Sequence, residues 1–175
     1  MRAMSLAVPV LTLAALVGCD GNSRRSIVSP QLDIADPAAG PSASGHGNWF
    51  NAAGEYVSRS FHAREMEPGV VEGSWEYHFT SPDGEKRLNK GEVNCLRIIP
   101  PNEAVISGRV LVTENPALLN QTQIFRVVDN GEGEGEAADR LSALFARSPD
   151  SGIDCSNFTP PNTTPIVSGN LQVRP

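Results

Sequence analysis

Three histidines, His46, His62 and His78, are the side chains best suited to metal binding or general acid-base chemistry in this chain of 175 residues. A shared metal would need two of them within a few ångströms, and catalysis would need a second group in hydrogen-bond reach. The strand pairing derived below separates His62 from His78 by about 13 Å along the sheet. We therefore expect surface or hydrogen-bonded histidines and neither a metal nor a catalytic site.

The one dense charge cluster is the acidic, glycine-spaced run DNGEGEGEAAD at residues 129–139. Its carboxylates are oxygen ligands of the kind that calcium prefers. Glycine, however, stands at the third and fifth positions, where an EF-hand loop supplies oxygen side chains, and no glutamate occupies the twelfth. We expect a solvated hairpin loop, with Asp129, Glu132 and Glu134 as weak calcium candidates.

Cys19 follows a short apolar segment. Arg2 and the run from Ser5 to Val17 have the pattern of a secretory signal, which is too short to span a bilayer. The sequence LVGC at 16–19 resembles the bacterial lipobox. That resemblance implies cleavage before Cys19 and acylation of its thiol and of the new amino terminus, which would anchor the chain durably in a membrane. The alternatives are an ordinary residue near a conventional cleavage site, or part of a buried helix.

Composition divides the chain into three parts. Residues 1–18 form the predicted signal peptide, residues 19–44 the lipidated cysteine and a linker, and residues 45–175 an all-β domain. The linker is rich in Ser, Ala, Gly, Pro and Asp, so we expect a flexible tether. A net charge of −6 argues against nucleic acid as a partner and against a basic lipid-binding surface. We expect an exported protein held at a bacterial membrane, inner or outer, by its lipid.

Cys95 and Cys155 remain after lipidation. In an exported chain an even pair without C-x-x-C spacing predicts a disulfide, which would tie the proline-rich segment 148–165 to the sheet. The alternative is two free thiols in an apolar site. Closing a loop of this size should stabilise the fold by roughly 3 to 5 kcal/mol.

Short segments rich in β-branched and aromatic residues alternate with turn signals, which predicts an antiparallel meander of about eight strands, closed as a barrel or packed as a sandwich. The expected strands are 46–51, 55–65, 70–80, 86–99, 103–113, 122–129, 140–147 and 166–174. The segment 136–147 fits a helical stripe as well as a strand. We favour a strand that pairs with TQIFRVV at 122–128, and keep a short helix as the alternative.

The register of one hairpin follows from its alternation of residue types. A three-residue loop, Glu67-Pro68-Gly69, with Gly69 in a left-handed conformation, pairs Phe61 with Trp75 and Val57 with Phe79. The less polar side chains then share one face. His62 falls opposite Ser74 and His78 opposite Ser58, on the polar face with Glu72 and Glu76.

Three segments, FRVVDNGEG at 125–133, NCL at 94–96 and GNLQVR at 169–174, together resemble a group of bacterial secreted proteins and lipoproteins that carries no established activity. The resemblance runs over the domain from Gly45 and implies a β fold without assigning catalytic residues. No G-x-S-x-G, H-E-x-x-H or phosphate-binding glycine loop occurs in the sequence. We expect no cofactor.

Three functions are compatible with these observations. The first is a membrane-tethered, non-catalytic binding or structural domain of the cell envelope that contacts an envelope protein. The second is a lipocalin-like carrier of a small apolar ligand, with Trp75, Tyr77 and Phe79 lining its interior. The third is an enzyme whose site no motif reveals. Lipid anchor, linker and sheet favour the first.

Overall fold

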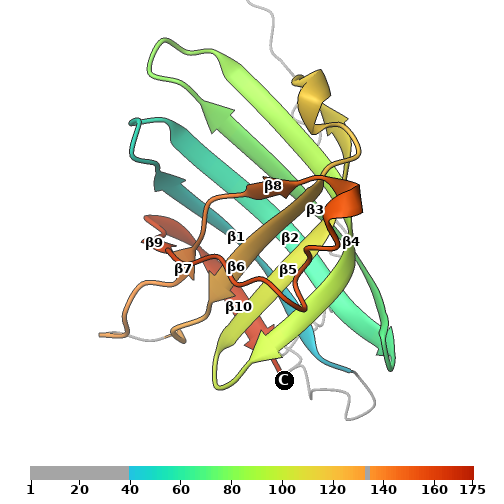
Figure 1. Ribbon diagram of the computed structural model, residues 1–175. Coiled ribbons are helices and arrows are strands. Elements are labelled where there is room, and N and C mark those ends of the chain that lie inside the picture. The colour runs from blue at the N-terminus through green and yellow to red at the C-terminus, as the bar shows by residue number, and fades with distance from the viewer. Residues whose placement is uncertain (1–39, 133–134) are drawn as a thin grey trace, which may run out of the picture. The chain divides into compact units, whose positions relative to one another are not determined.

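A computed structural model describes residues 40–132 and 135–175. These residues belong to one compact unit, Ala35–Pro175, and form a single ten-stranded antiparallel sheet with two 3-10 turns (Figure 1). The predicted signal peptide, Cys19 and most of the predicted linker lie outside the described residues. No helix in the described part of the chain is long and apolar enough to cross a membrane. The strands are β1 Ser42–Phe50, β2 Tyr56–Glu67, β3 Val70–Thr80, β4 Lys86–Ile99, β5 Glu103–Thr113, β6 Thr122–Val128, β7 Arg140–Leu141, β8 Phe145–Arg147, β9 Thr164–Pro165 and β10 Ser168–Arg174, with η1 Pro116–Leu118 and η2 Pro149–Ser151.

The predicted all-β antiparallel class is confirmed. The strand order is β10-β1-β2-β3-β4-β5-β6-β7-β9, with β8 paired to β6, so chain neighbours from β1 to β6 are sheet neighbours. The sheet curls into a half-barrel (Figure 1), and β8 is paired to one end of β6. Such curling follows from the right-handed twist of each strand, which adds up across the sheet.

The first and seventh predicted strands need the largest corrections, and the last begins at Ser168 and not at 166, after the short unpredicted strand β9. β1 begins at Ser42 and not at 46, because residues 42–45 pair with both β2 and β10; three residues assigned to the linker therefore belong to the sheet. The predicted strand 140–147 is interrupted, although both of its parts, β7 and β8, pair with β6 as expected. The Oγ of Ser142 accepts the Arg126 N–H at 2.8 Å in place of a backbone carbonyl, so the chain leaves the ladder there and no helix forms.

The predicted register of the β2–β3 hairpin is confirmed. Phe61 pairs with Trp75 and Val57 with Phe79. The loop differs from the prediction, because Glu67 already pairs with Val70 and an irregularity between Glu65 and Glu67 provides the one-residue shift. Gly69 has a φ of 81°, the left-handed conformation that glycine adopts without steric cost.

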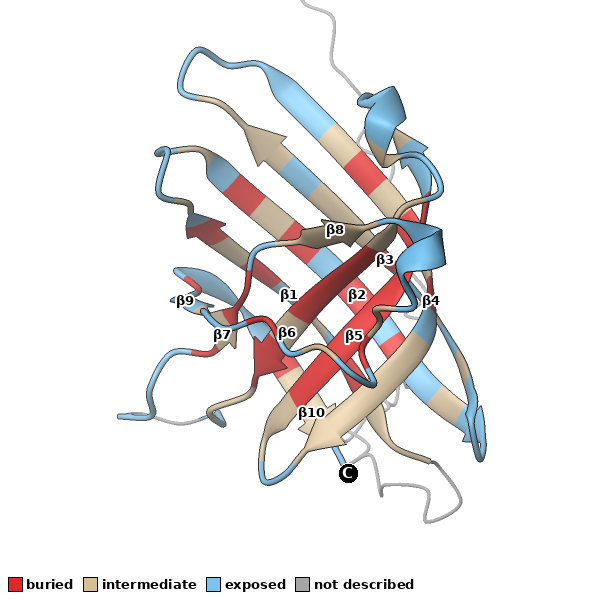
Figure 2. Ribbon diagram, in the orientation of Figure 1, coloured by how far each residue is buried: buried red, intermediate tan, exposed pale blue. Residues whose placement is uncertain are grey.

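Consecutive residues of β5 and β6 are buried (Figure 2), and apolar side chains on the two faces of this part of the sheet belong to two separate clusters. The main core fills the concave side and includes Trp49, Val57, Phe61, Trp75, Ile106, Phe125 and Leu171. A register shift between Val93 and Cys95 lets β4 contribute Cys95 and Ile99 to a second cluster, with Val105, Ile124 and Cys155. The proline-rich segment after β8 covers that second cluster.

Candidate ligand-binding site

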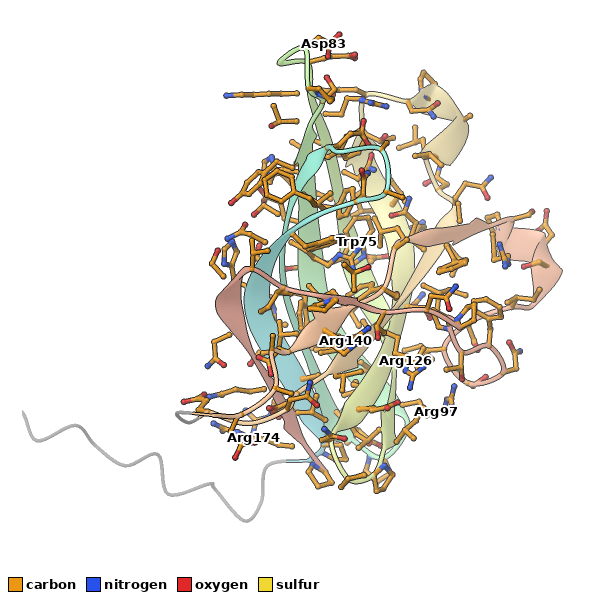
Figure 3. The ribbon with its side chains drawn as sticks, turned by 90° about the vertical axis from the view of Figure 1, so that its left-hand side faces the viewer. Trp75, Asp83, Arg97, Arg126, Arg140 and Arg174 are labelled. Atoms are coloured by element: carbon orange, nitrogen blue, oxygen red, sulfur yellow. A yellow bond between two sulfur atoms is a disulfide. The ribbon has the colours of Figure 1, made fainter. Side chains whose placement is uncertain are left out.

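A cavity of about 400 Å³ lies near the end of the half-barrel formed by the β3–β4 hairpin and η1. Asp83 marks the tip of this hairpin, Arg174 lies toward the opposite end, and Trp75 lies between them (Figure 3). Proteins bind small ligands in cavities of this size. The lining consists of Tyr77, Phe79, Glu85, Arg87, Leu88, Asn89, Glu114, Asn115, Leu118, Gln123, Ala143, Leu144 and Ala146.

The alternation of side chains along β3 and β4 determines which residues form one wall of the cavity. Tyr77 and Phe79 are two residues apart on β3, so they face the same side of the sheet, and their rings meet edge to face with centroids 5.4 Å apart. On β4, Asn89 pairs with Tyr77 and Arg87 with Phe79. The wall is therefore built from two adjacent rungs of the ladder, each carrying an aromatic ring beside a polar side chain.

The inner part of the cavity contains a buried amide. Gln123, on β6, is 2 % exposed and its Oε1 has no hydrogen-bond partner. At the outer edge, the Arg87 guanidinium lies 4.2 Å from the centre of the Phe79 ring and its Nη2 lies 2.8 Å from Glu55 Oε1. The cavity thus has a charge-paired outer edge and aromatic and aliphatic walls, and one of its lining residues, Gln123, carries a buried acceptor without a partner, which is costly.

Arg59 lies behind the Tyr77 wall and is completely buried. Its Cζ is within 5.2 Å of the centres of the Trp49, Tyr77 and Phe125 rings, and Nη1 donates to the Ser142 carbonyl at 3.0 Å. Nε and Nη2 have no partner, and no carboxylate of the described residues forms an ion pair with Arg59. Burial lowers the pKa of Arg59 to about 10.

Arg59 was not predicted from the sequence. Arg59 lies on β2 between Val57 and Phe61, at a position whose side chain the predicted register turns toward the apolar face. Its partner on β3 is Tyr77. The available signal was this charged residue at an inward position, since charged side chains are almost never fully buried without a partner. No family model, curated protein or solved structure matches this chain.

Of the three aromatic residues predicted to line an interior, Tyr77 and Phe79 line the cavity. Trp75 does not, because it lies deeper in the core, 2 % exposed, against Gly91 of β4. A Cβ at Gly91 would collide with the Trp75 ring. Glycine therefore leaves the space that the indole occupies.

The histidines are dispersed over the sheet as expected. His62 pairs with Ser74 and His78 with Ser58, and the His62 Nδ1 lies 3.3 Å from the Ser74 hydroxyl. His78 contacts Glu76, and the Nε2 of His46 lies 3.1 Å from the Ser58 hydroxyl. In the part of the chain that the structure describes, no three His, Cys, Asp or Glu side chains gather as a metal site would require.

The acidic loop 129–139 has a structural use that the sequence did not reveal. Asp129 Oδ2 accepts the Val173 N–H at 2.9 Å, and Asp139 Oδ2 accepts the Leu171 N–H at 2.9 Å. These amides lie on the edge of β10 that faces away from β1. Two carboxylates thus occupy positions where a neighbouring strand would place carbonyl oxygens.

Glu132, the second calcium candidate, contacts side chains of β10. Glu132 Oε1 accepts from the side-chain amides of Asn170 at 2.6 Å and Gln172 at 3.1 Å. The hydrogen bond from Asn170, and to a smaller extent that from Gln172, holds the pKa of Glu132 below its ordinary value. Glu134 lies outside the described residues. Asp129 and Glu132 both hold β10 by hydrogen bonds, so their described contacts are structural.

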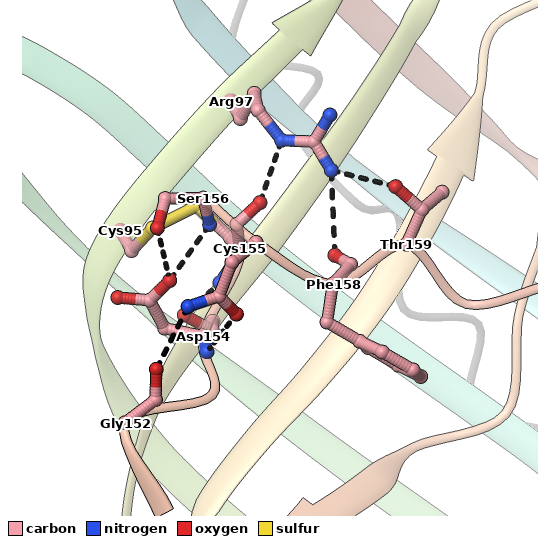
Figure 4. The surroundings of a disulfide bond; sticks show 10 residues. Cys95, Arg97, Gly152, Asp154, Cys155, Ser156, Phe158 and Thr159 are labelled. Carbon is pink, nitrogen blue, oxygen red and sulfur yellow. Dashed lines mark hydrogen bonds between the residues drawn. A yellow bond between two sulfur atoms is a disulfide. The ribbon is translucent and has the colours of Figure 1, made fainter.

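The predicted Cys95–Cys155 disulfide is confirmed, with the two Cα atoms 5.9 Å apart. Arg97 reinforces it from β4: Nε donates to the Cys155 carbonyl at 2.6 Å and Nη2 to the Thr159 hydroxyl at 2.6 Å (Figure 4). Ser107 Oγ accepts the Cys155 N–H at 3.1 Å. The bridge and these bonds fix the proline-rich segment over the second apolar cluster.

Proposed function

We propose that this chain is a membrane-tethered envelope lipoprotein whose half-barrel binds a small amphipathic ligand and does not transform it. The observation that carries this proposal is the cavity, whose lining combines the Tyr77 and Phe79 rings with the polar side chains of Asn89 and Gln123. Binding sites for small molecules typically join apolar walls to a few placed polar groups. This favours the carrier function over the structural one.

The lining also favours binding over turnover. It contains no serine, cysteine, histidine or lysine, so no side chain of the usual nucleophiles stands beside a general base. Its two carboxylates, Glu85 and Glu114, lie near the mouth, where Glu114 Oε2 accepts the Leu88 N–H at 3.3 Å. We therefore give the two carboxylates no role in chemistry and treat them as part of the outer surface of the site.

The strand directions suit a tethered carrier. The proposed tether from Cys19 joins the sheet at Ser42, the first residue of β1. β1 then runs toward the β1–β2 turn, which meets the cavity end through the bond between Glu55 and Arg87. An anchor at the start of β1 would leave the cavity mouth free, and would raise the local concentration of the binding domain at the membrane.

Native mass spectrometry of the protein purified from its host tests this function. We expect an added small-molecule mass that is lost in Ala146→Phe, because Ala146 lines the cavity and a phenyl group would fill it. Ala117→Phe is the matched control, since Ala117 is exposed on η1. If the wild type and both variants carry no added mass, the carrier function is refuted and a structural or protein-binding function is favoured.

A further inference from the structure

Arg59 is a buried cation with one unused hydrogen-bonding edge. A guanidinium presents two N–H groups side by side along its Nε and Nη2 edge, a geometry that matches the two oxygens of a carboxylate. In Arg59 these are the two nitrogens without partners, whereas Nη1 is held by Ser142. The guanidinium is therefore oriented by the protein and incompletely satisfied.

Arg126 shows how the chain satisfies the same edge elsewhere. Its Nε and Nη2 both donate to Glu103 Oε2, at 2.9 and 2.6 Å. Arg126 is only partly buried, and it has a carboxylate. Arg59 is fully buried and has none among the described residues, although burying a charge without a partner costs several kcal/mol.

Two neighbours of Arg59 connect it to the cavity, although Arg59 itself is not part of the lining. Arg59 and Asn89 flank Tyr77 on one rung of the sheet, and Tyr77 and Asn89 both line the cavity. The chain segment that accepts from Nη1 continues directly into the lining at Ala143 and Leu144. One aromatic side chain and one short irregular segment thus separate the guanidinium from the ligand space.

We propose that Arg59 is the anchor for an anionic headgroup, and that the ligand is a small amphipathic carboxylate whose apolar part lies along Tyr77, Phe79 and Leu144. This inference rests on the cavity-binding function proposed above. The carboxylate pairs with Nε and Nη2 after a shift of the Tyr77 ring or of residues 142–144. The aromatic rings around Arg59 exclude water, which strengthens a charge-assisted hydrogen bond.

The test compares ligands that share a chain and differ in the headgroup. Calorimetric titration of residues 35–175, the unit that contains all described strands, core and the disulfide, would use sodium decanoate and decanol. A cooperative unfolding transition establishes that the fragment is folded. We expect decanoate to bind about tenfold to a hundredfold more tightly, as one or two hydrogen bonds to a charged group provide.

Variants then assign the preference to one residue. Arg59→Met should lower decanoate affinity to that of decanol and leave decanol within about threefold. Arg109→Met is the matched control, because Arg109 is exposed and paired with Glu92 at 2.9 Å, and it should bind like the wild type. Trp49 lies 5.2 Å from Arg59 Cζ, so its fluorescence should respond to decanoate.

The outcomes distinguish a failure of the Arg59 anchor from a failure of the proposed cavity-binding function. Equal binding of decanoate and decanol by the wild type would overturn the Arg59 anchor and leave the cavity function in place. Binding of neither would overturn both. Because the wild-type comparison needs no substitution, a failure of Arg59→Met to fold leaves the test intact.

Discussion

Asp139 should be among the most sensitive positions outside the apolar core. Its carboxylate is 7 % exposed and accepts two backbone N–H groups, from Asn130 at 2.8 Å and Leu171 at 2.9 Å. Hydrogen bonds to a charged group are worth about 1.5 to 3 kcal/mol each, and release of a partly buried charge offsets part of that sum. We expect Asp139→Ala to cost about 3 kcal/mol, a large share of a domain's stability.

Urea unfolding followed by tryptophan fluorescence measures this cost. The midpoint should fall without a change in slope, because the loss concerns stability and not the area exposed on unfolding. Hydrogen exchange should show lost protection at Leu171 and in its β10 neighbours ahead of β4. Asp139→Asn should be intermediate, since one amide oxygen still accepts while the NH2 group faces a donor.

Glu132→Ala is the matched control from the same loop. Its carboxylate is exposed and bonds only side-chain amides, for which water can substitute. The midpoint should stay close to that of the wild type. A loss below about 1 kcal/mol in Asp139→Ala, or exchange that rises equally in every strand, would refute the assignment of these carboxylates as the closing contacts of β10.

Four further results are expected. Replacing Cys95 and Cys155 by alanine should lower the unfolding free energy by about 4 kcal/mol, from loop-closure entropy over a sequence separation of 60; unchanged urea midpoints would contradict this. Arg59→Met should stabilise the ligand-free fold by roughly 1 to 4 kcal/mol, because it removes an unpaired buried charge, and a lower melting temperature would count against that account. Decanoate affinity, unlike that of decanol, should fall as pH rises past the Arg59 pKa of about 10, since only the protonated guanidinium binds the anion. Cys19→Ala should abolish metabolic fatty-acid labelling and release the protein from membranes, and equal labelling of the variant would exclude the lipoprotein proposal.

Much of the sheet could be predicted because its determinants are local. The alternation of Val57, Phe61, Trp75 and Phe79 has the period of a strand, and only one register places these side chains on one face. Cys95 and Cys155 could be paired because they were the only two cysteines expected to remain unmodified after acylation of Cys19. Ser142 escaped prediction because its hydroxyl replaces a backbone carbonyl in the ladder, and such competition leaves no periodic signal.

The amino-acid sequence by itself determined strands β2 to β6, their meander order and the face of the β2–β3 hairpin that turns inward, because each depends on residues close together in the chain or joined by short turns. The tertiary structure alone decided what those faces enclose. The twist that accumulates over successive strands curls the sheet and brings β10 to the acidic loop, where Asp139 contacts Leu171. The same curvature encloses Arg59 without a carboxylate of the described residues beside it. The cavity has the same origin, since Tyr77, Gln123 and Leu144 come from separate strands and a covering segment, and their distance in space depends on the curvature of the whole sheet.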